Sequence, residues 1–375
     1  MKAKIVVGLG FGDCGKGLMT DYLSATSTNP IVIRYTGGHQ AGHTVVKDGI
    51  RHINASLGSG SLRNVPTYIS DYCCFYPPNL LREYNVLKTK VENVPKIYIN
   101  PRTIVTTPYD VAYNRLMESR LNHGSCGMGI GATMSRNEGA YKLFAIDLQN
   151  PMVLEEKLKQ IKNYYELKVY DEVTTNYFAK ERKQMQDKYL DTVESEMKYF
   201  RDAILSVPYY TRPYEFLKSY DTLIFEGAQG VLLDRDFGVF PNVTYGYTTS
   251  RNALEICKRL NVDSRLIDIY YITRCYSTRH GNGWMPEGEV KLIKNEDETN
   301  IFNEYQGNFR TAELDYDLLR YAIECDNSYS ADLDKKMVVT CLDQRPDFVF
   351  DKSRFPEMEL FFGSYSPDST SLTSL

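Results

Sequence analysis

The chain has 375 residues and a mass of 43.1 kDa, enough for one large domain or two ordinary ones. Charged residues make up 25% and hydrophobic residues 42% of it, and these values exclude disorder, collagen-like repeats and coiled coil as the main architecture. The formal net charge of -4 gives no global electrostatic reason to coat DNA or an anionic membrane. We therefore expect neither nucleic acid nor a membrane as a partner.

Cysteine usage and the N-terminus bear on the compartment. The eight cysteines are scattered and form no Cys-x-x-Cys pair, so we expect reduced thiols and no zinc site. The first residues lead directly into a β-type segment, and no run of about 18 apolar residues occurs. These features predict a cytoplasmic protein.

Short apolar, β-branched segments alternate with helical patterns along the chain. Strands are expected at 4–8, 30–35, 96–99, 221–225, 267–273 and 337–341. Helices are expected at 17–24, 107–120 and 314–324. Continuous apolar strands separated by helices are typical of a buried, mainly parallel sheet. We predict a single large α/β domain with helical insertions, extending over 1–375.

The stretch from about 150 to 215 is the main helical insertion. It is rich in Lys, Glu and Tyr and has helical periodicity. Its basic residues alternate with similar numbers of acidic ones, which favours a solvated helical subdomain over a nucleic-acid-binding arm.

A glycine-rich loop follows the first expected strand. It reads Gly10-Phe11-Gly12-Asp13-Cys14-Gly15-Lys16-Gly17 and leads into a helix. This strand–loop–helix context resembles a P-loop, in which backbone amides and a lysine hold phosphate oxygens. Gly17 stands where a P-loop has Ser or Thr for Mg²⁺. Asp13 lies inside the loop instead, where a carboxylate can bind a metal or accept a proton.

Two of the five histidines lie close together after the second strand, in the segment Arg34-Tyr35-Thr36-Gly37-Gly38-His39-Gln40-Ala41-Gly42-His43-Thr44. Either they only cap turns, or one of them acts as an acid or base in this Gly-rich loop directly after a strand. Together with the phosphate loop, this segment is similar to the adenylosuccinate synthetase family.

The resemblance continues in order along the chain. The segment 124–131 resembles a Gly-rich loop of the family, and 225–230 with 232–234 matches almost letter for letter. Residues 243–244, 276–279 and 340–343 follow, the last resembling a guanine-reading motif. Membership implies a ligase of purine biosynthesis. Such an enzyme joins L-aspartate to C6 of a 6-oxopurine nucleoside 5′-monophosphate through a 6-phosphoryl intermediate, driven by GTP or ATP with Mg²⁺.

The resemblance also implies roles for individual residues. Asp13 and His43 are the expected catalytic residues, and Asp13 with the carbonyl of Gly42 is the expected Mg²⁺ ligand set. The remaining expected contacts are, for the nucleotide phosphates, Gly12, Gly15, Lys16 and Gly17; for the purine monophosphate, Gln40, Ser125, Cys126, Gln229 and Thr244; for aspartate, Arg310 and Thr311; and for the donor base, Asp343.

Several departures from the family pattern concern the substrates. Met128 and Cys126 replace an expected Arg and Thr, and the Arg-rich aspartate loop retains only Arg310. Gly307 stands where the family has an arginine near the ribose 2′-hydroxyl. Cys341 replaces a lysine beside the donor guanine, which leaves GTP, ATP and dATP open as donors.

These changes, and a chain shorter than bacterial members, resemble the phage 2-aminoadenylosuccinate synthetases, which act on dGMP on the way to 2-aminoadenine DNA. A phage enzyme of this kind would work in the host cytoplasm. Against this, phage enzymes have a smaller residue at the position of Asp13. We expect dGMP slightly ahead of IMP, and IMP with GTP stays open as the alternative.

Two further expectations concern assembly and class. The resemblance implies a homodimer in which one subunit contributes a residue to the partner's substrate phosphate, and Arg136 and Lys142 are candidates for that residue. A non-catalytic GTP-binding regulator is the alternative of a different class, since it would need the phosphate loop and Asp343 but not His43.

Overall fold

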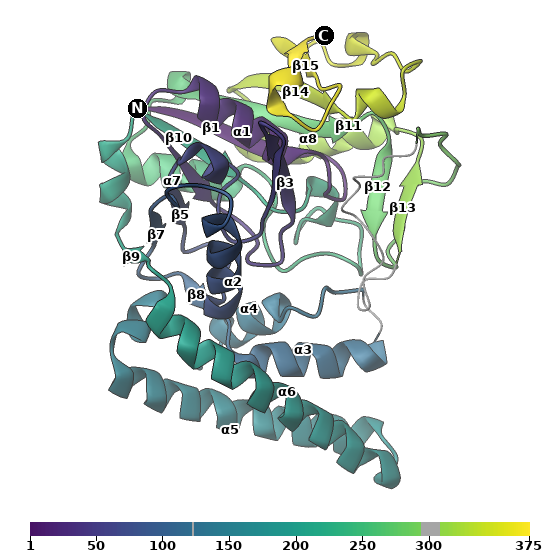
Figure 1. Ribbon diagram of the computed structural model, residues 1–375. Coiled ribbons are helices and arrows are strands. Elements are labelled where there is room, and N and C mark those ends of the chain that lie inside the picture. The colour runs from purple at the N-terminus through teal and green to yellow at the C-terminus, as the bar shows by residue number, and fades with distance from the viewer. Residues whose placement is uncertain (122–123, 294–307) are drawn as a thin grey trace.

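A ten-stranded sheet runs through the centre of the described molecule (Figure 1). The structure is a computed structural model that describes residues 1–121, 124–293 and 308–375. The sheet is parallel except for the pairing of β15 with β16. In spatial order its strands are β16 (Thr373–Ser374), β15 (Leu360–Gly363), β14 (Asp334–Thr340), β11 (Ile267–Arg274), β1 (Lys2–Gly8), β10 (Thr222–Glu226), β2 (Pro30–Arg34), β5 (Thr67–Ile69), β7 (Ile97–Ile99) and β9 (Tyr210–Thr211).

Three two-stranded sheets accompany the central sheet. The pairs β3–β4 and β12–β13 are antiparallel, and β6–β8 is parallel. Their bounds are β3 (His43–Lys47), β4 (Ile50–Asn54), β6 (Cys74–Phe75), β8 (Ile104–Val105), β12 (Ser277–His280) and β13 (Phe309–Ala312).

Helices cover both faces of the sheet because the side chains of each strand point alternately to the two sides. On β1, Ile5 and Val7 belong to the core cluster shared with α7 and α8, whereas Val6 packs with α1. The α-helices are α1 (Lys16–Thr26), α2 (Pro77–Lys88), α3 (Pro108–Leu121), α4 (Ile130–Glu138), α5 (Pro151–Asn176), α6 (Ala179–Ser206), α7 (Arg251–Leu260) and α8 (Tyr316–Ser330). Short 3₁₀ turns lie at Ser61–Arg63, Ala145–Gln149, Tyr214–Ser219, Val231–Leu233, Ser264–Leu266, Leu342–Gln344, Lys352–Arg354 and Ser369–Ser371.

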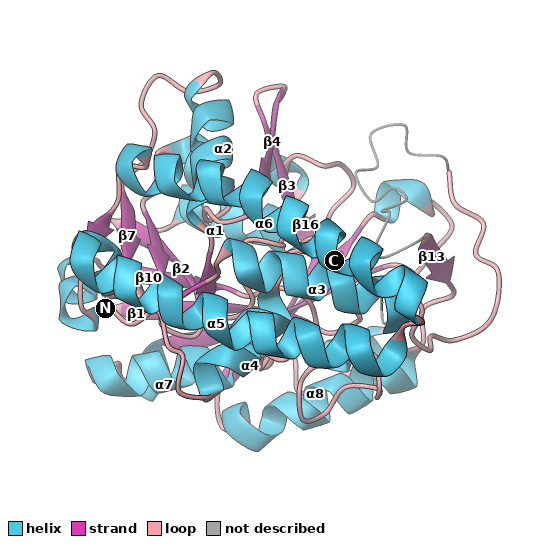
Figure 2. Cartoon of the chain, turned by 90° about the horizontal axis from the view of Figure 1, so that it is seen from below, coloured by secondary structure: helices cyan, strands magenta, loops and turns pink. Residues whose placement is uncertain are grey.

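The two longest helices, α5 and α6, form a layer beyond α3, away from the central sheet (Figures 1 and 2). The side chains that α5 buries recur every three or four residues, at Leu154, Leu158, Ile161, Tyr165, Val169 and Val173. That spacing produces one apolar stripe along the helix. The stripe joins a separate core cluster with α2, α3 and α6. After α6 the chain returns to the sheet edge as β9, so the expected helical insertion of 150–215 contains a strand near its end.

The carboxyl ends of five neighbouring parallel strands meet at one edge of the sheet. In spatial order these strands are β14, β11, β1, β10 and β2. Most of the segments singled out in the sequence follow directly from one of these ends. The exceptions are 124–131 and the segments that contain Thr244 and Arg310. Open α/β sheets bind ligands at this edge, and the fold therefore brings the motifs together although the outermost residues, Gly10 and Asp343, are 333 positions apart.

The predicted α/β class with a mainly parallel central sheet is confirmed. All six expected strands and all three expected helices are present, with ends that differ by a few residues. Apart from β7, strands of two or three residues, such as β5 and β9, were not predicted, because so short a segment has no readable period. All eight cysteines are free thiols. Among the described residues, no helix is long and apolar enough to span a membrane.

Candidate active site

The phosphate loop connects β1 to α1 and is packed against the segment that follows β10. The Lys16 ammonium donates to the backbone carbonyl of Gln229 at 2.5 Å, and Lys16 is only 3% exposed. The carbonyl of Gly10 passes so close to Gly230 that a Cβ there would lie 2.2 Å from it. Only a glycine at 230 allows the two loops to approach this closely.

Gly17 explains the departure from the P-loop pattern. A Cβ on Gly17 would lie 3.0 Å from Cβ of His43 and 3.1 Å from Oγ of Ser59. A Ser or Thr side chain at 17 would compete for this space. The first turn of α1 is therefore covered by His43, which the tertiary structure brings directly to the phosphate loop.

His43 is held by a carboxylate that the sequence interpretation gave no role. Its Nδ1 lies 2.6 Å from Oε1 of Glu226, at the end of β10. Glu226 is fully buried and also accepts hydrogen bonds from the amide and hydroxyl of Ser59. This arrangement orients the imidazole and leaves Nε2 as the ring nitrogen that can contact a ligand.

The electrostatics of this pair follow from its burial. Burial lowers the pKa of His43, and the neighbouring Glu226 carboxylate opposes this effect. Burial on its own would raise the pKa of Glu226, but His43, Arg34 and Ser59 outweigh it and bring that pKa to about 2. Glu226 is therefore ionised near neutral pH.

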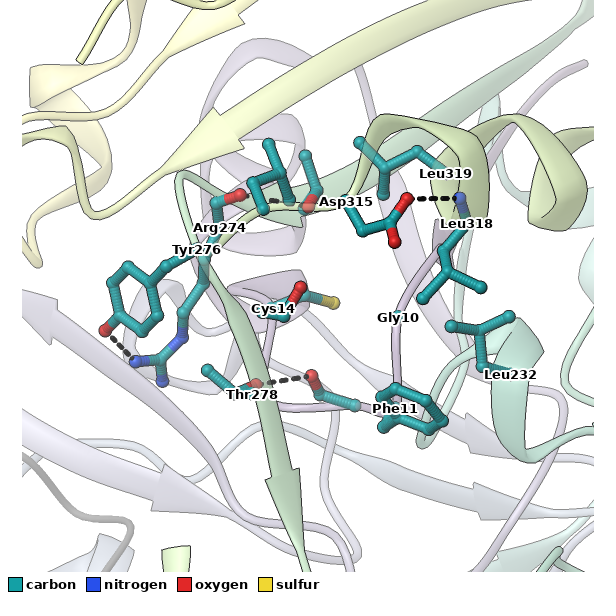
Figure 3. A pocket seen from close by; sticks show the side chains of 14 residues that line it. Gly10, Phe11, Cys14, Leu232, Arg274, Tyr276, Thr278, Asp315, Leu318 and Leu319 are labelled. Atoms are coloured by element: carbon teal, nitrogen blue, oxygen red, sulfur yellow. Dashed lines mark hydrogen bonds between the residues drawn. The ribbon is translucent and has the colours of Figure 1, made fainter. Parts of the chain in front are cut away.

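The rear of the phosphate loop is fixed by β11 and β12, across a small apolar cavity of about 20 Å³ (Figure 3). The Arg274 guanidinium donates from Nε to the carbonyl of Asp13 at 2.5 Å, and the Thr278 hydroxyl donates to the carbonyl of Gly12 at 3.4 Å. Asp13 has a φ of +48°, a backbone conformation that is uncommon for a non-glycine residue. These bonds hold the loop in the form that exposes the Asp13 carboxylate.

In front of the loop lies a cavity of about 480 Å³. This volume suits a small organic ligand such as a mononucleotide. Its lining includes every residue that the sequence assigned to the purine monophosphate, namely Gln40, Ser125, Cys126, Gln229 and Thr244. These five residues come from four separate segments of the chain, so the tertiary structure brings together what the sequence indicated only one motif at a time.

Two acceptors in this cavity have no hydrogen-bond partner within the part of the chain that the structure describes. The side-chain carbonyl oxygens of Gln40 and Gln229 are buried and make no hydrogen bond. A buried polar atom without a partner costs free energy. A ligand with N–H donors would satisfy both.

Helix α3 supports the Gly-rich loop that contributes to the cavity. Asn114 donates to the Ser125 hydroxyl at 3.2 Å and accepts from the amide of Gly129 at 3.0 Å. Glu118 accepts from the amide of Gly124 at 2.6 Å. The loop is therefore fixed from below by one face of α3.

The cavity also has lining residues to which the sequence interpretation gave no role. Lys168 and Tyr165 reach it from α5, and Arg279 and His280 reach it from β12. His280 Nε2 lies 3.6 Å from Oδ2 of Asp13, which links the catalytic candidate to the cavity wall. Arg279 is the last residue of the quoted motif 276–279 and His280 follows it directly, so the sequence already marked this segment. Lys168 is one of many lysines in the helical insertion, and no sequence signal marks it.

The residues expected to bind aspartate lie at the edge of the cavity. Arg310 and Thr311 lie on β13 opposite Arg279 and Thr278 of β12. The Arg310 guanidinium donates to the carbonyls of Gly281 and Gly283, which line the cavity.

Asp343 is exposed and follows β14. The last residue of that strand, Thr340, donates to the carbonyl of Cys14 at 2.9 Å. Asp343 thus lies beyond the side of the phosphate loop that faces β14.

The expected Mg²⁺ ligands are compatible with the ion. Asp13 offers a partly exposed carboxylate and Gly42 an exposed backbone carbonyl, both of them hard oxygen donors. No cluster of three His, Cys, Asp or Glu occurs among the described residues. This donor set fits Mg²⁺ bound by one or two protein ligands together with substrate phosphates and water.

Arg136 is the wrong candidate for a residue that reaches a partner subunit, because it is buried and forms an ion pair with Asp110 of its own chain at 2.8 Å. Lys142 is exposed. Gly307, on which the loss of a 2′-hydroxyl contact rested, lies outside the described residues.

The adenylosuccinate synthetase family model matches residues 5–344. The chain belongs to the adenylosuccinate synthetase family. The adenylosuccinate synthetase of Blochmanniella pennsylvanica is 33% identical over 291 residues, which are 75% of this chain and 64% of that protein. That of Thermodesulfovibrio yellowstonii is 32% identical over 302 residues, 78% and 66% of the two chains. The match to the first of these relatives thus spans less than two thirds of its length.

Two solved structures share the fold. Fully ligated adenylosuccinate synthetase from Plasmodium falciparum superposes with a TM-score of 0.65 at 19% identity, covering all of this chain and 87% of that one. The succinoaminodeoxyadenylate synthetase of cyanophage S-2L, bound to dGMP and dATP as an energy donor, gives 0.64 at 15% identity, with 100% and 95% covered. At these identities the likeness establishes the fold, which agrees with the parallel sheet described above.

Proposed function

We propose that this protein is a ligase that forms a C–N bond between L-aspartate and C6 of a 6-oxopurine nucleoside 5′-monophosphate, using a purine nucleoside triphosphate and Mg²⁺. The observation that carries the proposal is the convergence of Gln40, Ser125, Cys126, Gln229 and Thr244 on one cavity next to the phosphate loop. A phosphate-binding loop beside a cavity of nucleotide size suits the transfer of a phosphoryl group between two bound nucleotides.

The chemistry requires activation of the purine oxygen, because oxide is a very poor leaving group. In the proposed first step Asp13 takes the N1 proton while O6 attacks the γ-phosphorus, and the nucleoside diphosphate leaves. His43, oriented through Nδ1 by Glu226, hydrogen-bonds the transferring phosphoryl group through Nε2. This bond requires the protonated imidazole, which the negative charge of Glu226 and of the phosphoryl oxygens stabilises in the complex. Lys16 and the amides of the phosphate loop hold the remaining phosphates. Catalysis is by positioning and charge stabilisation.

In the proposed second step the amino group of aspartate attacks C6 and inorganic phosphate leaves. Arg310 and Thr311 hold the amino acid at the cavity edge. Mg²⁺, held by Asp13 and the carbonyl of Gly42, would neutralise charge on the donor phosphates. The 5′-phosphate of the mononucleotide lies toward Thr244, and Lys168, which also lines the cavity, is the cation proposed to bind it.

We propose dGMP as the preferred mononucleotide. Guanine offers N1–H and two N2–H donors, whereas hypoxanthine offers N1–H alone. The cavity presents two unpaired carbonyl acceptors, on Gln40 and Gln229, and the Asp13 carboxylate is next to it through His280. This surplus of acceptors supports guanine over hypoxanthine. The fold shared with the cyanophage enzyme, which binds dGMP and dATP, is compatible with this choice.

The test is a product assay with Mg²⁺ and L-aspartate that crosses dGMP, GMP and IMP against GTP, ATP and dATP. We expect turnover of dGMP to exceed that of IMP. Equal or faster turnover of IMP would instead identify an adenylosuccinate synthetase acting on IMP, with the lost arginines compensated elsewhere. The same grid identifies the phosphate donor, for which Asp343 and Cys341 leave GTP and ATP open.

The variant His43→Asn separates an enzyme from a GTP-binding regulator. We expect it to lose turnover by about 10²-fold or more while triphosphate binding, measured by calorimetry, is retained. A wild-type protein that binds the triphosphate but converts no pair of nucleotides would overturn the ligase proposal.

A further inference from the structure

Two arginines lie opposite each other on the small sheet at the edge of the cavity. Arg279 of β12 and Arg310 of β13 are directly paired in the antiparallel register. Arg279 is 2% exposed and lines the cavity. Cross-strand neighbours lie close enough for their side chains to interact, and two like charges in that position repel each other.

Among the residues that the structure describes, neither guanidinium has a carboxylate partner. Within residues 1–121, 124–293 and 308–375, no Asp or Glu lies within ion-pair distance of Arg279 or Arg310. Arg279 donates to the carbonyls of Trp284 at 2.7 Å and Asn242 at 2.8 Å. Arg310 donates to the carbonyls of Gly281 and Gly283. Nε of each arginine is buried without a hydrogen-bond partner.

This arrangement is electrostatically unfavourable in the ligand-free protein. Burial lowers the pKa of Arg279 to about 10, and the positive charge of Arg310 adds to the effect. Burial also lowers the pKa of Arg310. A buried charge without a counter-charge is costly, and the attraction of a bound anion would offset both the desolvation cost and the mutual repulsion.

A purely structural role accounts for only part of these contacts. Gly283 lies directly on the Arg279 guanidinium, where a Cβ would be 1.8 Å from a terminal nitrogen. The carbonyl bonds therefore do hold the 281–284 segment in place. The Arg279 guanidinium also lies 4.5 Å from the centroid of the Phe11 ring. None of these contacts satisfies the two unpaired Nε–H groups.

We propose that Arg279 is a second arginine of the amino-acid site, which together with Arg310 binds the carboxylates of the substrate. This inference rests on the proposed function for the identity of the substrate. Two guanidinium groups can each form charge-assisted hydrogen bonds to one carboxylate of a dicarboxylic amino acid. Arg279 thereby compensates for the arginines missing from the 306–315 loop, and it makes the site selective for aspartate over amino acids with one carboxylate.

The experiment measures amino-acid binding directly, by calorimetry on the full chain saturated with dGMP. The ligands are L-aspartate, L-asparagine, which lacks the side-chain carboxylate, and β-alanine, which lacks the α-carboxylate. We expect Arg279→Gln to weaken aspartate binding by about 10- to 100-fold. The ratio of the variant's affinity for aspartate to its affinity for one of the two analogues should fall by the same factor. The variant's affinity for dGMP should stay within about twofold of the wild-type value.

The matched control is Arg345→Gln. Arg345 also donates to a backbone carbonyl, that of Cys275, but it pairs with Glu313 and does not line the cavity. The Arg345→Gln variant should bind aspartate, asparagine and β-alanine with the same affinities as the wild-type protein. If Arg279→Gln does not fold, Arg279→Lys keeps the charge and loses the forked geometry, and the same narrowing is expected in weaker form.

Equal losses for aspartate and both analogues, or no loss, would overturn the clamp and leave Arg279 a structural residue. Failure of the proposed function gives a different result. In that case the wild-type protein would show no turnover while aspartate still binds in a way that depends on Arg279. Turnover with unchanged selectivity in the Arg279 variants would contradict only the present inference.

Discussion

At the scale of single residues, the pair of His43 and Glu226 determines how the centre of the site is built. Glu226 lies at the end of a buried strand, is fully buried, and accepts from His43 and from the amide and hydroxyl of Ser59. His43 in turn covers the first turn of α1 at Gly17. The interaction joins two segments that are 183 residues apart. One buried carboxylate therefore fixes the imidazole, the 59 turn and the phosphate loop relative to one another.

The same pair predicts acid sensitivity of the fold. The pKa of Glu226 is about 2 in the folded protein, against about 4.5 when unfolded, so between these values the unfolded chain binds more protons and stability falls as pH falls. The lowered pKa of His43 also makes stability fall as pH falls, below about pH 6.5. We expect Glu226→Gln to flatten the pH dependence of the free energy of unfolding between about pH 4.5 and 2. At neutral pH it should cost up to about 3 kcal/mol.

The measurement is urea denaturation from pH 7 to about pH 2, which covers the window between the two pKa values. Glu194→Gln, on an exposed position of α6, is the control and should follow the wild-type curve. A Glu226→Gln curve parallel to the wild type over the whole range would show that Glu226 is not ionised in the folded protein.

At the scale of elements, α5 has a larger role than its composition indicates. Its sequence is typical of a solvated helix, and one side of it is exposed. The other side carries the buried stripe, and Tyr164, Tyr165 and Lys168 reach the nucleotide-sized cavity. The Lys168 ammonium lies over the rings of Tyr113 and Tyr164, 5.7 and 5.0 Å from their centroids. These cation–π contacts hold the charge at the cavity wall.

We therefore expect Lys168→Ala to raise KM for the mononucleotide by about tenfold, because a charge-assisted hydrogen bond to the 5′-phosphate is lost. KM values for aspartate and for the triphosphate should stay within twofold. Lys162→Ala is the matched control on the same helix, since Lys162 is half exposed and pairs with Glu166. A rise in KM for the triphosphate in place of the mononucleotide would assign Lys168 to the other ligand.

At the scale of the whole molecule, one edge of the sheet carries the chemistry and a separate helical layer supports it. Within that layer Asp110 of α3 is fully buried. It accepts from Arg136 at 2.8 Å and from the Tyr165 hydroxyl at 2.7 Å. The network ties α3, α4 and α5 together beneath the cavity. Arg136 thus stabilises its own chain and has no free guanidinium to offer a partner subunit.

Removing Arg136 tests this assignment. Arg136→Met leaves the buried Asp110 without its counter-charge, and we expect a loss of about 3–5 kcal/mol in the free energy of unfolding. The oligomeric state, measured by light scattering, should not change. Lys142→Ala, at an exposed position, should leave stability unaffected. Unchanged stability of Arg136→Met together with a raised KM for the mononucleotide would restore Arg136 as a residue of a shared site.

The local sequence determined the parts whose signal is short in range. Apolar β-branched segments such as 267–273 predicted buried parallel strands, and the motifs around Asp13, His43 and Gln229 indicated the family and the candidate site. Turn chemistry and strand period depend on neighbouring residues, so both can be read directly from the chain. The tertiary structure alone decided which groups meet across long separations. Glu226 reaches His43, Arg279 faces Arg310, and Lys168 enters the cavity because the order of parallel strands and the packing of α3 against α5 and α6 bring them there. The burial that leaves these charges paired or unpaired is a property of the assembled fold, and no local pattern encodes it.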